Sequence, residues 1–136
     1  MSRARICLGT GPDGLHYLPR LEGGRYRLSE WVTTDVDRLC AALRGARVHP
    51  STETMEHLAS ALRLVRGQPF QGVKAGYEWA HSEGLATRAE ILVADAAHLV
   101  ADWHLDHGDT TAALWAAGQG LLASPFDEAL YRDRMR

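Results

Sequence analysis

Acidic and histidine side chains recur at helical spacing between residues 95 and 107, which makes this segment the first candidate for metal chemistry. Asp95, His98 and Asp102 follow one another at three- and four-residue steps, and His104 and His107 lie further along. A helix would bring such side chains to one surface, and histidine and carboxylate groups are zinc ligands. The same spacing also describes the solvated side of an amphipathic helix, and histidines suit a helix C-terminus. We expect a solvated face here and no bound metal.

Nucleophilic or acid–base catalysis has little support in the sequence. None of the serines lies in a Gly-x-Ser-x-Gly turn, and Gly9–Gly11 lacks the later glycine and Lys-Ser/Thr of a phosphate-binding loop. The acidic pairs Glu53 with Glu56, and Asp127 with Glu128, stand early in predicted helices, where negative charge is favourable. We therefore expect a protein that is not an enzyme and that binds no cofactor.

Arginine and tyrosine gather near the N-terminus, where they have the chemistry to contact DNA phosphates. Residues 1–30 carry five arginines against three acidic residues, although the whole chain has a formal net charge of −2. The candidates are Arg20, Arg25 and Arg27, with Tyr17 and Tyr26 close to them. The alternative is that these arginines only solvate a short sheet. Without a recognition helix, we expect any DNA binding by this segment to be weak and strongly salt-dependent.

Large apolar side chains near the C-terminus are the candidates for a protein interface. Trp115 lies near the edge of the apolar side of its predicted helix, and Leu130 and Tyr131 belong to a last helix with no later helix in the sequence to cover it. Five aromatic residues are alternatively core residues or the lining of a peptide or ligand groove, with the core favoured for Trp103: Phe70, Tyr77, Trp79, Trp103 and Trp115. A protein partner, a second copy of the chain and a small molecule therefore all remain open as binding partners.

The composition describes an ordinary globular protein. The chain has 136 residues, of which 46% are hydrophobic and 24% charged, and this length suits one domain with a buried core. No apolar run approaches the roughly 20 residues that a membrane span needs, and no signal peptide pattern is present. Cys7 and Cys40 are too isolated to form a disulfide framework or a zinc site. We expect a cytoplasmic protein with no membrane contact.

Two short extended runs, Leu15–Leu18 and Arg25–Leu28, are separated by a connection containing Pro19, Gly23 and Gly24. This pattern predicts a β-hairpin, and the Gly-Pro-Asp-Gly sequence within Thr10–Gly14 predicts a turn before it.

Helical periodicity begins after residues 33–35, any of which can cap a helix. The first predicted helix ends at Gly45 and Pro50, and the second runs from Ser51 to Gly67. A loop over 67–76 follows, then a long helix from Tyr77 and Trp79 to about His107, a helix over Thr110–Ala123 and a last helix from Asp127 to Arg136. In the long helix, Leu85, Leu92, Leu99 and Trp103 share one face; the helix over 110–123 is expected to bury Ala113, Leu114, Ala117, Leu121 and Leu122.

Residues 85–125 resemble one tetratricopeptide repeat. Gly108 stands at the turn, Ala113 and Gly120 stand where the two helices of a repeat touch, and Pro125 follows the second helix. A match of this kind predicts a helical array.

A wider resemblance is more specific. Gly23–Leu28, Val32 and Asp35 resemble a junction in SARP-type regulators, where the last hairpin of a winged-helix domain enters the bacterial transcriptional activator domain. Three later segments are also similar to the activator domain: Ala61–Phe70, Trp79–Ala80 and Ser124–Arg132. Some relatives join this domain to a LysM module or an ATPase.

The resemblance implies a mainly α, tetratricopeptide-like array of about five helices with a small N-terminal β-hairpin. Residues 1–30 would be the remnant of a winged-helix wing, and residues 31–136 the activator domain. The implied role is protein contact, through dimerisation or regulation of an attached effector, with DNA bound through a fuller winged-helix domain. We expect the chain to be a piece of a larger regulator or a stand-alone remnant of one.

Overall fold

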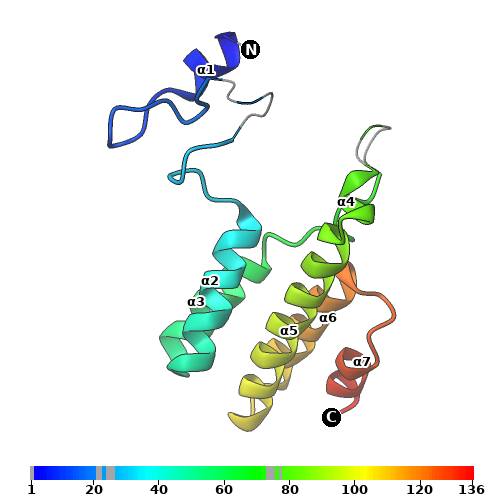
Figure 1. Ribbon diagram of the computed structural model, residues 1–136. Coiled ribbons are helices and arrows are strands. Elements are labelled where there is room, and N and C mark those ends of the chain that lie inside the picture. Colours follow the sequence, from blue (N-terminus) through cyan, green and yellow to red (C-terminus); the bar gives the residue numbers. More distant parts are fainter. Residues whose placement is uncertain (1, 21–22, 24–26, 73–75, 77) are drawn as a thin grey trace. The chain divides into compact units, whose positions relative to one another are not determined.

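The computed structural model describes residues 2–20, 23, 27–72, 76 and 78–136, and the chain divides into two compact units, Met1–Thr34 and Asp35–Arg136. The described residues form helices and no extended strand (Figure 1). The helices are α1 (Ser2–Leu8), α2 (Asp35–Val48), α3 (Thr52–Leu62), α4 (Trp79–Ser82), α5 (Leu85–Asp106), α6 (Thr110–Ala123) and α7 (Glu128–Met135). The mainly helical fold class is therefore confirmed.

The predicted N-terminal β-hairpin is wrong for the described residues. The turn is found where it was expected, because the Gly14 N–H donates to the Gly11 carbonyl at 3.0 Å. The run at 15–18, however, pairs with the residues before this turn, through a single antiparallel bridge between Thr10 and His16. Arg25 and Tyr26, in the predicted second strand, lie outside the described residues.

Two features of the N-terminal unit favour this pairing, while the Tyr17 carbonyl also accepts the Ser29 N–H at 2.9 Å. The four-residue turn closes a shorter loop than the Pro- and Gly-containing connection would, and so costs less chain entropy. The Arg5 guanidinium of α1, a helix the sequence did not predict, donates to the carbonyls of Leu18 and Pro19 at 2.8 and 3.1 Å. The Leu18 carbonyl is therefore already used by a side chain.

Helices α2 and α3 form an antiparallel pair joined at Pro50. The predicted start of α2 is confirmed, but α2 continues through Gly45 to Val48. Helix α3 begins after Ser51 as predicted, but it ends at Leu62, before the predicted Gly67. Ser51 caps it: the Thr54 N–H donates to Ser51 Oγ at 3.2 Å, and the Ser51 N–H donates to Thr54 Oγ1 at 3.0 Å. These reciprocal bonds satisfy two backbone donors at the start of the helix.

The long helix predicted from Tyr77 and Trp79 to His107 is divided in two. Gly84 adopts a φ of 71°, in the left-handed region, and separates the single turn of α4 from the 22 residues of α5. A left-handed residue cannot continue a right-handed α-helix, and glycine adopts this conformation without steric cost. Tyr77 itself lies outside the described residues.

The turn between α5 and α6 has the geometry that the repeat resemblance predicts. Gly108 has a φ of 77°, its N–H donates to the Leu105 carbonyl at 3.0 Å, and the Asp109 N–H donates to the His104 carbonyl at 2.8 Å. This is a Schellman ending. Asp109 then caps α6 by accepting the Ala112 N–H at 3.0 Å. The predicted bounds of this helix, Thr110 and Ala123, are confirmed.

Small residues form the seam between α5 and α6, which lie side by side (Figure 1). The buried residues of this seam are Ala96, Ala97, Val100 and Ala101 of α5 with Ala113, Ala116, Ala117 and Gly120 of α6. The large residues of the predicted α5 face, Leu92, Leu99 and Trp103, are only partly buried. On α6 the prediction was wrong for Leu114 and Leu122, whose exposed fractions are 49% and 43%.

Helix α7 covers the other side of the seam. Leu130 is completely buried, and its Cδ1 lies 2.6 Å from the position a Cβ would take at Gly120. Asp127 caps α7, as predicted, by accepting the N–H groups of Ala129 and Leu130 at 2.9 and 3.1 Å. The absence of a side chain at Gly120 therefore creates the space that Leu130 fills.

Candidate functional site

The side of α6 turned away from α5 carries exposed apolar side chains. At about 100° per residue, the residues opposite the small-residue seam are Thr111, Leu114, Trp115, Gly118 and Leu122; we call them the α6 outer face. No residue of α6 is charged. A helix that buries its alanines and exposes leucines presents apolar surface of the kind found at interaction sites.

Trp115 lies at the edge of the α6 outer face. Its ring is half-buried and packs against the hydrophobic core. The Arg63 guanidinium, just after α3, lies over the ring at 5.4 Å from its centroid, within the range of a cation–π contact. Trp115 therefore has a packing role within the unit, and only part of its ring is available to a partner.

The two α7 residues predicted for an interface lie in different environments. Leu130 is inside the core and exposes no surface. Tyr131 is exposed, and its hydroxyl donates to the Pro125 carbonyl at 3.1 Å. Of this pair, Tyr131 has surface to offer a partner, whereas Leu130 holds α7 in place. The use of Trp115, Leu130 and Tyr131 in an interface stays a prediction.

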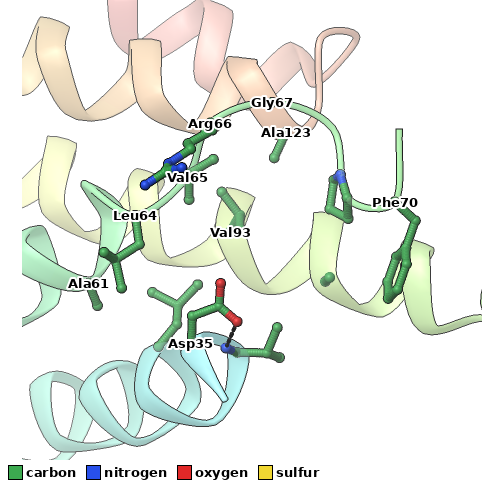
Figure 2. A pocket seen from close by; sticks show the side chains of 13 residues that line it. Asp35, Ala61, Leu64, Val65, Arg66, Gly67, Phe70, Val93 and Ala123 are labelled. Carbon is green, nitrogen blue, oxygen red and sulfur yellow. Dashed lines mark hydrogen bonds between the residues drawn. The ribbon is translucent and has the colours of Figure 1, made fainter. Parts of the chain in front are cut away.

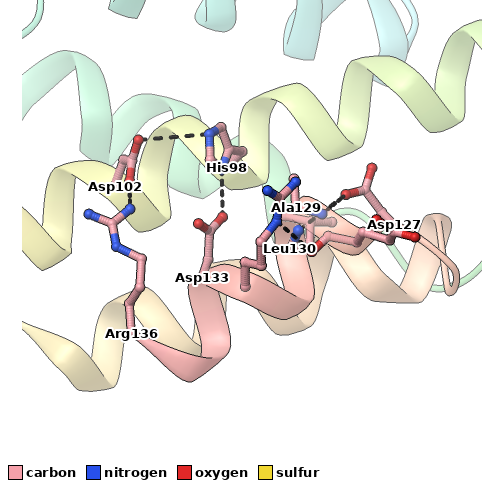
Figure 3. Close-up of polar contacts among 9 residues, drawn as sticks. His98, Asp102, Asp127, Ala129, Leu130, Asp133 and Arg136 are labelled. Atoms are coloured by element: carbon pink, nitrogen blue, oxygen red, sulfur yellow. Dashed lines mark hydrogen bonds and ion pairs between the residues drawn. The ribbon is translucent and has the colours of Figure 1, made fainter.

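Polar groups of α5 hold the C-terminal end of α7 (Figure 3). His98 Nδ1 lies 2.5 Å from Asp133 Oδ2, and the Asp133 side chain is only 3% exposed. Arg136 pairs with Asp102 at 2.6 Å, and Asp102 lies 3.7 Å from His98 Nε2. The segment expected to be a solvated helix face is thus partly the surface on which α7 packs.

The other members of the histidine–aspartate series are also in local contacts. Asp95 pairs with Arg47 of α2 at 2.9 Å. His104 Nδ1 lies 3.7 Å from Asp109, and the His107 ring stacks on Trp103 at 4.2 Å between centroids. Over the described ranges, no group of three or more histidine, cysteine or carboxylate side chains is arranged to hold a metal ion.

The sequence alone did not reveal the His98–Asp133 contact, because Asp133 lies 35 residues away on another helix. A signal was nevertheless present: an acidic residue three positions after Leu130 lies on the same side of a helix as that leucine. A buried leucine on α7 therefore brings this carboxylate toward the core.

The structure describes two of the three arginines predicted to contact DNA. Arg20 and Arg27 are exposed, and Arg25 lies outside the described residues. Of the neighbouring tyrosines, Tyr17 is half-buried and Tyr26 also lies outside the described residues. DNA contact through this segment stays a prediction.

No helix within the described ranges is both long and apolar enough to span a bilayer.

Comparison with known proteins adds one match. Residues 34–136 match a family described as the bacterial transcriptional activator domain. The search of curated proteins and the search of solved structures gave no match. The match begins one residue before the helical unit, which starts at Asp35, and includes α2 to α7. The helical array and the repeat-like α5–α6 pair fit this family, and the chain belongs to the bacterial transcriptional activator domain family.

Proposed function

We propose that this chain is a non-catalytic regulatory domain of a bacterial transcription regulator, and that two copies associate through the α6 outer face. Membership in the activator-domain family supports the regulatory role. The observation that carries the self-association is the inverted packing of α6, which buries alanines and a glycine and exposes Leu114 and Leu122. We place this function in the cytoplasm, where bacterial genes are transcribed.

The α6 outer face suits a second copy of itself. None of its own residues is charged, and the Arg63 guanidinium over Trp115 lies at its edge, so the two leucines can meet their own copies across a two-fold axis with that charge left at the rim. At Gly118 a Cβ would meet no atom within 4 Å, so an opposing helix can approach closely there. Covering the exposed half of one leucine gains about 1 kcal/mol. Two leucines from each copy then contribute about 4 kcal/mol, and the rest of the covered surface, at Thr111, Trp115 and Gly118, has to supply the remainder against the lost translational and rotational freedom of the two copies.

The oligomeric state tests this proposal. In sedimentation velocity the chain should form a reversible species of about twice its mass of 15.0 kDa. Leu114→Asp and Leu122→Asp should each shift the equilibrium to monomer, because an aspartate carboxylate would have to be buried without a partner. Both side chains are exposed in the single chain, so circular dichroism should show unchanged helix content.

Val48→Asp is the matched control. Val48 is an apolar side chain with 67% exposure at the end of α2, away from α6. Replacing it makes the same chemical change on another surface, and the association should be unaffected. A wild-type chain that stays monomeric at hundreds of micromolar would contradict the proposal, as would equal losses from Val48→Asp and Leu114→Asp.

A further inference from the structure

A cavity of ≈ 250 Å³ opens in the helical unit between the start of α2, the segment after α3 and the first half of α5 (Figure 2). Its walls are apolar and reach the core at Leu39, Ala89, Val93 and Ala123, which are all buried. The volume is somewhat below the range of about 300–1,000 Å³ typical of drug-sized ligands. The cavity therefore suits a small molecule with an apolar body.

The mouth of the cavity is polar. Asp35 and Arg66 line it from different elements, α2 and the segment after α3, and a second depression shares both residues and adds Gln68. One Asp35 carboxylate oxygen accepts the N–H of Val36 at 3.0 Å. Arg66 is exposed and has no ion pair with any residue in the described part of the chain. An apolar interior that leads to an uncommitted guanidinium is an amphipathic site.

Phe70 forms part of the wall in a strained conformation. It is the one described residue other than glycine with a positive φ, at 60°. A bulky side chain in the left-handed region costs about 1–3 kcal/mol, and such residues cluster at ligand-binding segments. The fold accepts this cost in the loop that forms the cavity wall and leaves the ring partly exposed.

We propose that this cavity binds a small amphipathic carboxylate, with the hydrocarbon part against Leu39, Val65 and Val93 and the carboxylate at Arg66. A guanidinium presents paired N–H donors that match the two oxygens of a carboxylate. The hydrocarbon part removes apolar wall surface from water. The site lies within one copy of the helical unit, so binding does not require self-association.

Octanoate is the probe, titrated into the full chain by isothermal calorimetry. It should bind with a dissociation constant in the micromolar to low millimolar range. Arg66→Gln should weaken binding about tenfold, because a partly exposed charge-assisted contact is lost. Asp35→Asn should strengthen binding several-fold, because it removes the like charge at the mouth while the asparagine side-chain oxygen can still accept the Val36 N–H. Both side chains are exposed, so the variants should fold.

Arg88→Gln is the matched control, since Arg88 is an exposed arginine of α5 that does not line the cavity. Octanol tests the head group and should bind at least tenfold more weakly than octanoate. The proposal is overturned if octanoate shows no binding at low millimolar concentration, if Arg66→Gln and Arg88→Gln behave alike, or if octanol binds equally well. The Leu114→Asp chain should bind octanoate as the wild-type chain does, so failure of the self-association proposal can be distinguished from failure of the octanoate proposal.

Discussion

Gly120→Ala is the sharpest test of how α5, α6 and α7 pack together. A Cβ at this position would lie 2.6 Å from the Ala97 Cβ and 2.6 Å from the Leu130 Cδ1. Contacts shorter than 3.0 Å require one of the neighbours to move. The Ala97 methyl is fixed to the backbone of α5, and Leu130 is completely buried, so neither can rotate into open space. The substitution therefore has to displace one helix from another.

The magnitude follows from two opposed effects. Replacing glycine with alanine inside a helix gains about 1 kcal/mol from propensity. Overpacking a close-packed seam costs about 1–3 kcal/mol. Because the new methyl group meets two fixed neighbours, we take the upper part of that range and expect a net loss of about 1–2 kcal/mol in the free energy of unfolding.

Gly118 supplies a matched control in the same helix. A Cβ there would meet no atom within 4 Å, so only the propensity gain of up to about 1 kcal/mol should appear. Gly120→Ala and Gly118→Ala should each be made in a chain that already carries Leu114→Asp, so that self-association adds nothing to the measured stability. Urea unfolding followed by circular dichroism gives the comparison. If Gly120→Ala is as stable as Gly118→Ala, the close packing of α6 against α5 and α7 is refuted.

Two further predictions concern polar contacts. His98→Ala leaves the Asp133 carboxylate, 3% exposed, without its partner, and should lower the free energy of unfolding in urea by about 1–3 kcal/mol. Adding Asp133→Leu should recover most of that loss. An unchanged urea midpoint for His98→Ala would contradict the contact. The backbone N–H of Leu15, and then the indole of Trp31, lower the pKa of Asp13 from its ordinary 3.8. Because the carboxylate form of Asp13 accepts these bonds, they stabilise the folded N-terminal unit at pH values above 3.8. The stabilisation is lost as the pH falls through the lowered pKa of Asp13. Trp31→Phe should raise this pKa in an NMR titration, and no change would rule out the indole contribution.

Helix ends could be predicted from the sequence because local chemistry determines them. Helices α3, α6 and α7 begin where they were expected, after Ser51, Asp109 and Asp127, each of which caps its helix, and Gly108 forms the expected turn. Each of these signals depends on a side chain and backbone groups within a few residues. The break at Gly84 was missed, since glycine within an otherwise helical pattern is often tolerated and its left-handed φ depends on how α4 packs.

The buried side of α6 could not be predicted in the same way. Every residue of α6 is uncharged, so hydrophobic periodicity does not distinguish one side from another, and the predicted buried side included Leu114 and Leu122 together with alanines. Whether leucine or alanine faces the neighbouring helix depends on the distance between the two helix axes. That distance is a tertiary property, set here by alanines on α5 and by the insertion of Leu130 beside Gly120.

The inverted packing of α6 has a consequence for function. Helices whose contact residues are alanine and glycine approach near the lower end of the usual 8–10 Å range, and at that spacing leucines do not fit between them. They must lie on the outer side, where they cost free energy as long as water covers them. Charged or polar residues at Leu114 and Leu122 would avoid that cost without changing the seam. The close α5–α6 seam thus accounts for the position of these leucines but not for their apolar chemistry, and a partner that covers them accounts for both.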